Sequence, residues 1–280
     1  MMTLWQGLCH LPTSWHPAIG RFFGKLLFII AKSRKKIAQA NIGACFPNLS
    51  KADQQILLQN NFTHLGRSFI DTGIAWFWSD KKIQSNLDYE IIGIDLLFER
   101  NSMNGNLIIF KHSQHLELDA RLLAMNAEIY GVSRTHNSAS MNKMQEKGRL
   151  SSIKDTADKN NPRKFMKWLK AGKNVLYAID QDYGWDHSMK LKFFNQEAAT
   201  INTTRKIIDA ANANLLFLNS YYKNKKLILE IESINHLGLN SIELAQKINN
   251  LMEEKILQHP SEYLWMHRRF KSTLGKKFYR

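Results

Sequence analysis

The chain has 280 residues, of which 44% are hydrophobic and 22% are charged, so it is long enough for one large globular domain and unlike a disordered chain. Lysine and arginine together number 39 against 24 acidic residues, and the net charge of +15 indicates a surface that attracts nucleic acid, anionic lipid headgroups or an acidic protein. The 2 cysteines do not make a disulfide framework or a four-ligand zinc site, which favours a reducing compartment.

The first fifty residues begin with a segment that has no continuous apolar run, and a stretch rich in aromatic and basic residues follows it. Polar residues and prolines interrupt residues 1–20, which therefore predict neither a membrane-spanning helix nor a secretory signal. Residues 22–30 are mostly apolar, and the basic run Lys32-Ser33-Arg34-Lys35-Lys36 follows them. This pattern suits a helix in the headgroup region, so we expect residues 1–50 to form an amphipathic segment on an anionic membrane surface. The alternative is an ordinary N-terminal helix packed on the domain.

A single domain is expected over residues 51–280, and it begins with a helix. Ser50 can cap this helix, with Asp53 in the capping-box position, and apolar residues at steps of four, three and four form one face. The helix runs into Trp76-Phe77-Trp78. Three consecutive aromatic residues cannot share one helix face, so at least one is expected to point away from the core. It then serves as a membrane anchor or as the wall of a lipid site; the alternative is ordinary core packing.

From residue 105 onward, short β-rich runs alternate with helical stretches. This alternation indicates an α/β fold with a mainly parallel sheet covered by helices. The last two strands are expected to pair as a hairpin across residues 223–226, which makes the sheet mixed. Asn240, with Glu243 at the third position, is expected to cap the last long helix. The expected strands are 107–111, 127–133, 174–179, 189–194, 215–221 and 227–232, and the expected helices are 115–125, 138–150, 162–171, 200–213 and 241–257.

A histidine and a glutamate five positions apart follow the first of these strands. His112 is expected at the carboxyl end of the strand and Glu117 at the start of the next helix, where open α/β sheets build their sites. Imidazole accepts a proton from a hydroxyl near neutral pH, and a neighbouring carboxylate holds the ring in one tautomer. On one continuous helix the two side chains would lie about 140° apart, so the pair requires the strand to end near Lys111.

A histidine followed by four residues and an acid is the signature of the glycerolipid acyltransferase superfamily, and further blocks accompany it here. These blocks are NIGACFP at 41–47, GIAWFW at 73–78, LELDAR at 116–121, RTHN at 134–137, KGRL at 147–150, DQDYG at 180–184 and YLWMHRRFK at 263–271. With them, the chain resembles the late acyltransferases of lipid A biosynthesis, the lauroyl/myristoyl-type family, over nearly its whole length. The resemblance implies a glycerolipid-acyltransferase-like fold with an N-terminal membrane-associating segment.

The resemblance also implies a role for several side chains. His112 would be the general base on a hydroxyl of the lipid acceptor, which attacks the thioester of a fatty acyl chain borne by acyl carrier protein. Glu117 would orient and charge-stabilise His112, much as the acid of a serine-protease triad does. Arg149 and Arg134 would bind the phosphates of the lipid or stabilise negative charge on the thioester oxygen. Asp182 would organise the site by pairing with one of these arginines.

Each of these assignments has a structural alternative. Arg149 is otherwise a solvated charge at a helix end, and Arg134 and Asp182 are otherwise members of structural ion pairs. Arg268 and Arg269 are expected to face phosphate or the membrane, with an ordinary surface role as the alternative.

No cofactor and no metal are expected. His115 places a second histidine within the block, and together with His112, Glu117 and Asp119 it resembles a metal site. Zinc requires a third and a fourth ligand that converge, and this spacing matches no familiar ligand set.

The implied partners are acyl-loaded acyl carrier protein, a phosphorylated lipid A precursor and an anionic membrane surface. Family members usually begin with a clear transmembrane helix, whereas this chain has an interrupted segment, so we expect peripheral or weak attachment to the cytoplasmic face of the inner membrane. One alternative is an acyltransferase for another lipid, a glycerophospholipid or a glycolipid. Another is a non-enzymatic basic protein that binds membrane surfaces or nucleic acid, which leaves His112 and Glu117 without a role. No nucleic-acid-binding motif supports it.

Overall fold

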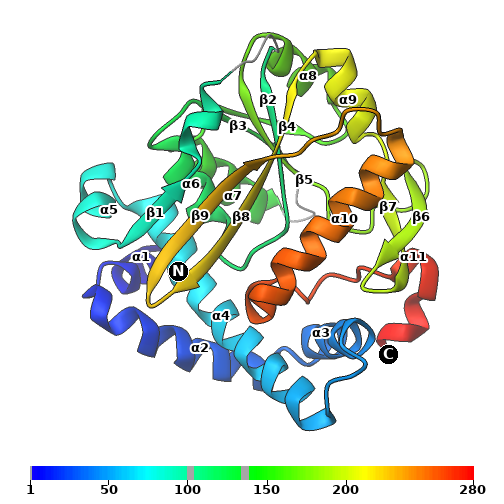
Figure 1. The fold of residues 1–280 in the computed structure, drawn as a ribbon. Coiled ribbons are helices and arrows are strands. Elements are labelled where there is room, and N and C mark those ends of the chain that lie inside the picture. The colour runs from blue at the N-terminus through cyan, green and yellow to red at the C-terminus, as the bar shows by residue number, and fades with distance from the viewer. Residues whose placement is uncertain (1, 100–103, 134–138) are drawn as a thin grey trace.

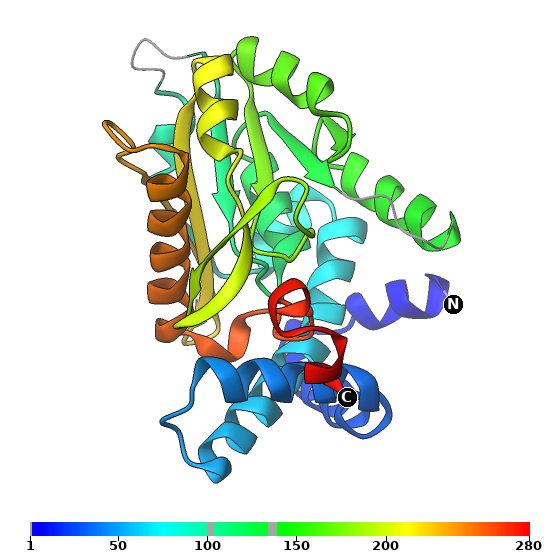
Figure 2. The same cartoon turned by 90° about the vertical axis from the view of Figure 1, so that its right-hand side faces the viewer.

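The computed structural model describes residues 2–99, 104–133 and 139–280. Within them a seven-stranded sheet lies at the centre, helices cover both of its faces, and the first four helices gather at its lower end (Figures 1 and 2). The helices are α1 (Met2–Cys9), α2 (His16–Ile30), α3 (Lys32–Cys45), α4 (Lys51–Phe77), α5 (Asp80–Asn86), α6 (Leu116–Ala124), α7 (Ala139–Leu150), α8 (Pro162–Lys170), α9 (Thr204–Ala211), α10 (Ser241–Gln258) and α11 (Lys271–Leu274). The strands are β1 (Tyr89–Ile92), β2 (Asn106–Phe110), β3 (Ile129–Ser133), β4 (Asp155–Asp158), β5 (Asn174–Ala178), β6 (Ser188–Phe193), β7 (Gln196–Ile201), β8 (Asn214–Lys223) and β9 (Lys226–Ser233).

The sheet has the order β1-β9-β8-β2-β5-β3-β4, and β8 and β9 form its antiparallel pair among the described strands. All its other neighbouring strands run parallel. The predicted fold class, a mixed and mainly parallel sheet covered by helices, is therefore confirmed, and so is the late hairpin. Parallel neighbours bring the carboxyl ends of β2, β3 and β5 to the same edge of the sheet.

Strand β2 lies near the middle of the sheet and is buried along its whole length. Leu107 and Ile109 face a core shared with α8, α9 and α10, whereas Ile108 and Phe110 face a second core shared with α4 and α6. A strand that is covered on both faces needs apolar residues at successive positions, which explains the unbroken run that ends just before His112.

The two predicted helix caps are confirmed. The Ser50 hydroxyl accepts a hydrogen bond from the amide of Asp53 at 3.1 Å. At the start of α10, the Asn240 side chain accepts from the Glu243 amide at 3.0 Å, and the Glu243 carboxylate accepts from the Asn240 amide at 2.8 Å. These local signals set helix starts because they satisfy amides that have no partner inside the helix.

Three strands were not expected from the sequence. Strands β1 and β4 are short edge strands of four residues each, without a strong apolar pattern. Strand β7 occupies the first positions of the helix predicted over 200–213, which instead begins at Thr204. The expected strand 189–194 pairs with β7 in a separate two-stranded sheet, joined by Phe194 and Asn195 at φ values of 50° and 58°. Phenylalanine rarely adopts such a conformation, so its sequence gives no turn signal.

The N-terminal helices pack closely against the rest of the chain. Ala38, Ile42 and Cys45 of α3 belong to the core that also contains α8 and α10. The Asn41 amide donates to the carbonyl oxygens of Trp265 at 2.7 Å and of His267 at 2.6 Å. The predicted boundary at residue 50 thus lies in a turn between two helices that share one core, and the division into 1–50 and 51–280 stays a prediction.

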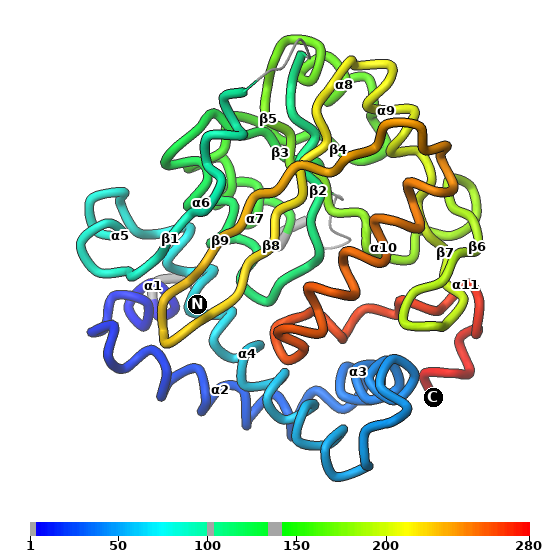
Figure 3. Tube along the Cα trace, viewed as in Figure 1, coloured from blue at the N-terminus to red at the C-terminus, as the bar shows by residue number. Residues whose placement is uncertain are grey.

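Helices α2 and α4 cross at glycines (Figure 3). A Cβ atom added at Gly66 would lie 2.1 Å from the carbonyl oxygen of Gly20 and 2.3 Å from the amide nitrogen of Gly24. The two backbones therefore touch, and any larger side chain at Gly66 would separate the helices. This contact fixes α2 against the domain while leaving its opposite side in solvent.

Candidate active site

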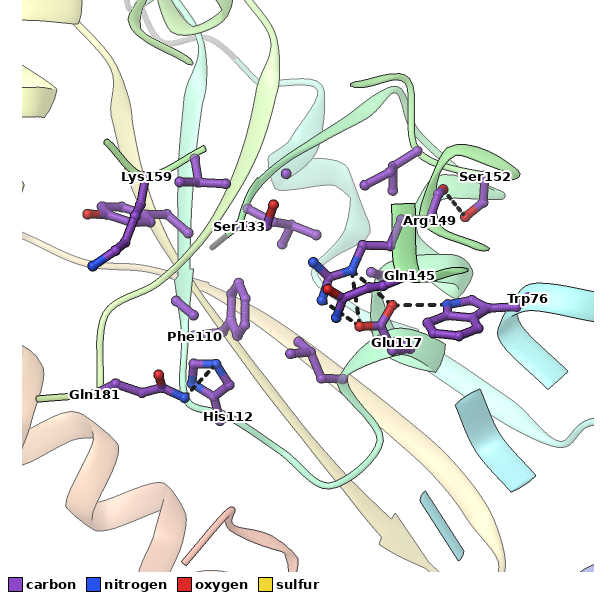
Figure 4. A pocket seen from close by; sticks show the side chains of 18 of the residues that line it. Trp76, Phe110, His112, Glu117, Ser133, Gln145, Arg149, Ser152, Lys159 and Gln181 are labelled. Carbon is purple, nitrogen blue, oxygen red and sulfur yellow. Dashed lines mark hydrogen bonds and ion pairs between the residues drawn. The ribbon is translucent and has the colours of Figure 1, made fainter. Parts of the chain in front are cut away.

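A pocket of about 460 Å³ lies at the carboxyl ends of β2, β3 and β5 (Figure 4). These strands and the adjoining helices line it with apolar side chains and with polar side chains in similar measure. The apolar lining includes Phe110, Leu116, Ala120, Val132, Ile153 and Leu176, and the polar groups include Arg34, His112, Glu117, Arg149, Lys159 and Gln181.

His112 follows β2 and is held by a carboxylate from the neighbouring strand. Its ring Nδ1 lies 2.5 Å from Asp180 Oδ1, and its amide donates to Asp180 Oδ2 at 2.8 Å. Asp180 follows β5 and is only 2% exposed. Burial raises the pKa of Asp180, but the charge of His112 and its two hydrogen bonds outweigh burial and hold that pKa below its usual value. An ionised Asp180 accepts the Nδ1 hydrogen, which leaves Nε2 as the basic nitrogen.

The basic nitrogen of His112 faces the pocket beside Gln181 (Figure 4). The distance between His112 Nε2 and Gln181 Nε2 is 3.1 Å. Since Nε2 carries the lone pair when Nδ1–H bonds to Asp180, the Gln181 amide is the donor. A hydroxyl that enters the pocket can take the place of this amide and present its proton to His112.

The predicted direct pairing of Glu117 with His112 needs correction. The Glu117 carboxylate instead accepts from Arg149, with Nε 3.1 Å from each oxygen and Nη2 2.5 Å from Oε1. It also accepts from Trp76 Nε1 at 3.1 Å. Asp180 holds His112 because β5 runs parallel beside β2, whereas Glu117 lies in the first turn of α6 and faces α4 and α7. Glu117 and His112 nevertheless line the same pocket.

Trp76 reaches Glu117 because Gly148 leaves room for its ring. A Cβ atom at Gly148 would lie 2.3 Å from Trp76 Cδ2, so the indole packs directly on the backbone of α7. Of the three consecutive aromatic residues, Trp78 is buried in the core, Trp76 lines the pocket and Phe77 contacts Trp5. The expectation that at least one of them points away from the core is confirmed.

Asp182 does not pair with an arginine among the described residues. Its carboxylate accepts from the Ser272 amide at 2.7 Å, the Ser272 hydroxyl at 2.6 Å and the Gly184 amide at 3.0 Å. Its own amide donates to His267 Nε2 at 3.0 Å. Asp182 therefore fixes the start of α11 and does not line the pocket. Arg149 pairs with Glu117, so the predicted pairing of Asp182 with Arg149 is wrong, and a pairing with Arg134 falls outside the described residues.

The two neighbouring arginines near the C-terminus differ sharply. Arg269 is 2% exposed, donates to the Ala199 carbonyl at 2.6 Å and to Thr200 Oγ1 at 3.1 Å, and covers the Phe193 ring. It cannot face phosphate or membrane, and that prediction is wrong because the side chain turns inward onto the β6–β7 hairpin. Arg268 is exposed and lies outside the pocket lining. Arg134 lies outside the described residues.

Several residues in or beside the pocket were not singled out from the sequence. Asp180 lies two positions before Asp182 and directly follows a predicted strand, as His112 does, so the pairing of these two strands is the signal that would have found it. Arg34 comes from the basic run assigned to membrane contact, and it also donates to the Met266 carbonyl at 3.3 Å. Gln181 and Lys159 carry no distinctive sequence signal, and only the packing brings them to the pocket.

His115 has no part in a metal site in the described residues, where no group of three or more histidine, cysteine, aspartate or glutamate side chains is arranged to hold an ion. Both of its ring nitrogens contact carboxylates, Asp119 at 2.9 Å and Glu262 at 3.0 Å.

Comparison with known proteins assigns the chain to a family. The family model for the bacterial lipid A biosynthesis acyltransferases matches residues 1–272. A lipid A biosynthesis palmitoleoyltransferase of Escherichia coli is 32% identical over 260 residues, which cover 91% of this chain and 84% of the relative. A lauroyltransferase of lipid A biosynthesis from the same organism is 31% identical, with coverage of 91% and 84%. A lipid A biosynthesis acyltransferase of Haemophilus influenzae is 28% identical, with coverage of 99% and 90%.

Among solved structures, the 1-acyl-sn-glycerophosphate acyltransferase PlsC of Thermotoga maritima aligns with 94% of this chain and 99% of its own. The sequence identity is 10% and the TM-score is 0.41.

Proposed function

Since this chain belongs to the bacterial lipid A biosynthesis acyltransferase family, we propose that it transfers a fatty acyl chain from acyl carrier protein to a hydroxyl of a phosphorylated lipid A precursor. The observation that carries this proposal is the His112–Asp180 pair: the basic nitrogen of His112 faces a pocket that has apolar walls and also contains Arg149. A base, a cation and an apolar wall are what transfer of an acyl chain to a hydroxyl requires.

His112 supplies the proton transfers. Its Nε2 takes the proton of the acceptor hydroxyl as the hydroxyl oxygen attacks the thioester carbonyl carbon. Asp180 stabilises the imidazolium that forms and keeps the ring in the Nδ1–H tautomer. When the tetrahedral intermediate collapses, the carbon–sulfur bond breaks and the imidazolium proton passes to the departing thiolate. The products are an ester on the lipid and the free thiol of the carrier, with no covalent enzyme intermediate.

Arg149 is the cation best placed to bind an anion in the pocket. Glu117 holds it from one side and is itself fixed by the indole of Trp76, so the guanidinium is oriented before substrate arrives. In this position it binds a phosphate of the lipid or the oxyanion of the tetrahedral intermediate. Glu117 therefore contributes by positioning Arg149, while Asp180 performs the orienting role first assigned to Glu117.

The N-terminal helices provide a surface for the membrane. Phe22 and Ile29 of α2 are 65% and 66% exposed, and Leu26 between them is 40% exposed. Arg21 and Lys25 flank this apolar stripe, as expected for a helix that lies among anionic headgroups. Among the described residues no helix is long and apolar enough to span a bilayer. Attachment through α2 to the cytoplasmic face of the inner membrane would bring the pocket to its lipid substrate.

The test is a reconstituted transfer reaction. Purified protein is incubated with acyl carrier protein that carries a twelve- or fourteen-carbon chain and with a Kdo-bearing tetra-acylated lipid A precursor, and mass spectrometry detects one added acyl group. We expect the gain with wild type and not with His112→Ala. Acylation of glycerophospholipid acceptors in place of the lipid A precursor would assign the same chemistry to another lipid. Absence of transfer to every acceptor would contradict the proposal.

A further inference from the structure

The loop that carries His112 is held by a segment near the C-terminus. The His112 carbonyl accepts from the Leu264 amide at 3.0 Å, and the Gln114 amide donates to the Glu262 carbonyl at 2.9 Å. Between these contacts, Ser113 pairs in antiparallel fashion with Tyr263. We call residues 262–264 the strap. Because the strap bonds to the backbone on both sides of Ser113, the direction of the His112 ring depends on where the strap lies.

A second histidine joins this loop to the strap through side chains. His115 is 2% exposed, and its Nδ1 lies 2.9 Å from Asp119 Oδ1, while its Nε2 lies 3.0 Å from Glu262 Oε2. An ionised carboxylate only accepts hydrogen bonds, so each ring nitrogen has to carry a hydrogen. This geometry requires the imidazolium form. The pKa of His115 agrees: burial lowers it, but Asp119 and Glu262 raise it to about 9.

The rest of the cluster keeps both carboxylates in place. Asp119 Oδ2 accepts from the hydroxyls of Ser113 and Ser220, each at 2.7 Å. Glu262 Oε2 accepts from the Tyr222 amide at 3.0 Å. Burial raises the pKa of Glu262, but the hydrogen bond from His115 and the charge of His115 bring it below its usual value. The titratable groups that face the cluster come from several elements: His64, Arg67 and Asp71 of α4, Lys111 after β2, Tyr222 of β8, Glu230 of β9 and His259 after α10.

We infer that His115 is a positioning residue for His112: as a buried cation between Asp119 and Glu262, it fixes the strap against the loop and thereby sets the direction of the His112 ring. The inference rests on the proposed role of His112 as the base. His115 itself does not line the pocket and has both nitrogens occupied, so it neither touches substrate nor exchanges protons with it.

Substitution of His115 by glutamine removes the charge but keeps a polar side chain. Two buried carboxylates then lose their common cation, and one amide cannot donate to both across the width of an imidazole. We expect Glu262 to withdraw and the strap to loosen, which leaves His112 with more than one orientation. A displacement of the order of 1 Å at a reacting group costs about 10²-fold in rate, so the kcat of His115→Gln should fall by about 10- to 100-fold.

The kinetic test compares His115→Gln with a variant that is destabilised elsewhere. Asn249→Ala is the control, because Asn249 is buried on α10 and bonds to the Lys192 carbonyl and to Thr200, away from the pocket. Both variants should unfold at a lower temperature than wild type. Only His115→Gln should lose kcat, with KM for the acyl donor and the acceptor changed by less than about twofold, since uniform binding is untouched. Equal kcat losses in the two variants, or none in His115→Gln, would overturn the inference.

A spectroscopic test does not depend on the reaction. Nitrogen-15 spectra of histidine-labelled protein at pH 7.5 should show one fully protonated imidazolium, lost in His115→Gln, and His112 in a single Nδ1–H tautomer. In His115→Gln the His112 signals should move toward the average of two tautomers. A neutral His115, or a His112 tautomer that the substitution leaves unchanged, would contradict the inference. If the wild-type protein fails to transfer acyl groups, the proposed function is wrong. These spectra still decide whether His115 sets the orientation of the His112 ring.

Discussion

His112 and His115 lie three positions apart, and their surroundings give them opposite chemistry. The His112 side chain is 17% exposed, has one carboxylate partner and presents its other nitrogen to the pocket. The His115 side chain is 2% exposed and has a carboxylate at each nitrogen. One carboxylate leaves a histidine with a lone pair for proton transfer, whereas two hold it as a permanent cation near neutral pH. The count of carboxylate partners, rather than sequence position, separates a base from a structural ion.

The largest effect on acyl transfer is expected when the proposed base, His112, is removed. His112→Ala should lower the rate of acyl transfer by about 10³-fold or more, because loss of a positioned general base removes its whole contribution. The fold should persist, since His112 lies at the edge of the core and its backbone contacts to the strap remain. Mass spectrometry of the lipid product measures the rate. Residual activity within tenfold of wild type would show that His112 is not the base.

Asp180→Asn tests the single carboxylate of His112. Asparagine keeps the shape but can donate to Nδ1, which favours the wrong tautomer and leaves the imidazolium unbalanced, so kcat should fall by about 10²- to 10⁴-fold. Asp182→Asn is the matched control, two residues along the same loop. This substitution weakens the contacts to Ser272, so it should lower the melting temperature while kcat stays close to the wild-type value. Equal kcat losses in the two variants would argue against a specific role for Asp180.

Because His115 has a carboxylate at each ring nitrogen, we expect the stability of the fold to depend on pH. The pKa of His115 is raised from 6.5 to about 9 in the folded state, so its contribution is complete below pH 6.5 and is lost as the pH rises through 9. The loss across this window should be on the order of 3 kcal/mol in the free energy of unfolding. Urea titrations at several pH values measure it, and His115→Gln should flatten the curve. An equally steep curve in the variant would assign the dependence to other groups.

Substitutions in the exposed apolar stripe of α2 are expected to change the state of His112 and His115 least. Serine at both Phe22 and Ile29 should weaken binding to anionic vesicles by about tenfold or more, because each side chain buries apolar area in the headgroup region. The melting temperature and the histidine spectra should stay unchanged, since both side chains lie in solvent. Vesicle co-sedimentation measures binding. Undiminished recovery with vesicles would mean that another surface attaches the protein.

Local patterns in the sequence determined a large part of this protein. The unbroken apolar run of β2 predicted a buried strand, its end placed His112 at the carboxyl edge of the sheet, and Ser50 and Asn240 marked two helix starts. Seven short blocks carried the resemblance that the family match bears out. Each of these signals acts within a few residues along the chain, through strand alternation, helix periodicity or a cap that satisfies a nearby amide.

Only the tertiary structure decided which side chains meet. His112 and Asp180 are separated by 68 positions, and His115 and Glu262 by 147. Sequence spacing therefore suggested Glu117 for His112, while the parallel pairing of β2 with β5 supplied Asp180. Arg268 and Arg269 are identical in type and adjacent, yet one is exposed and the other is buried against the β6–β7 hairpin. Charge and type are properties of a residue, but its partners follow from strand order and helix packing, which no local pattern encodes.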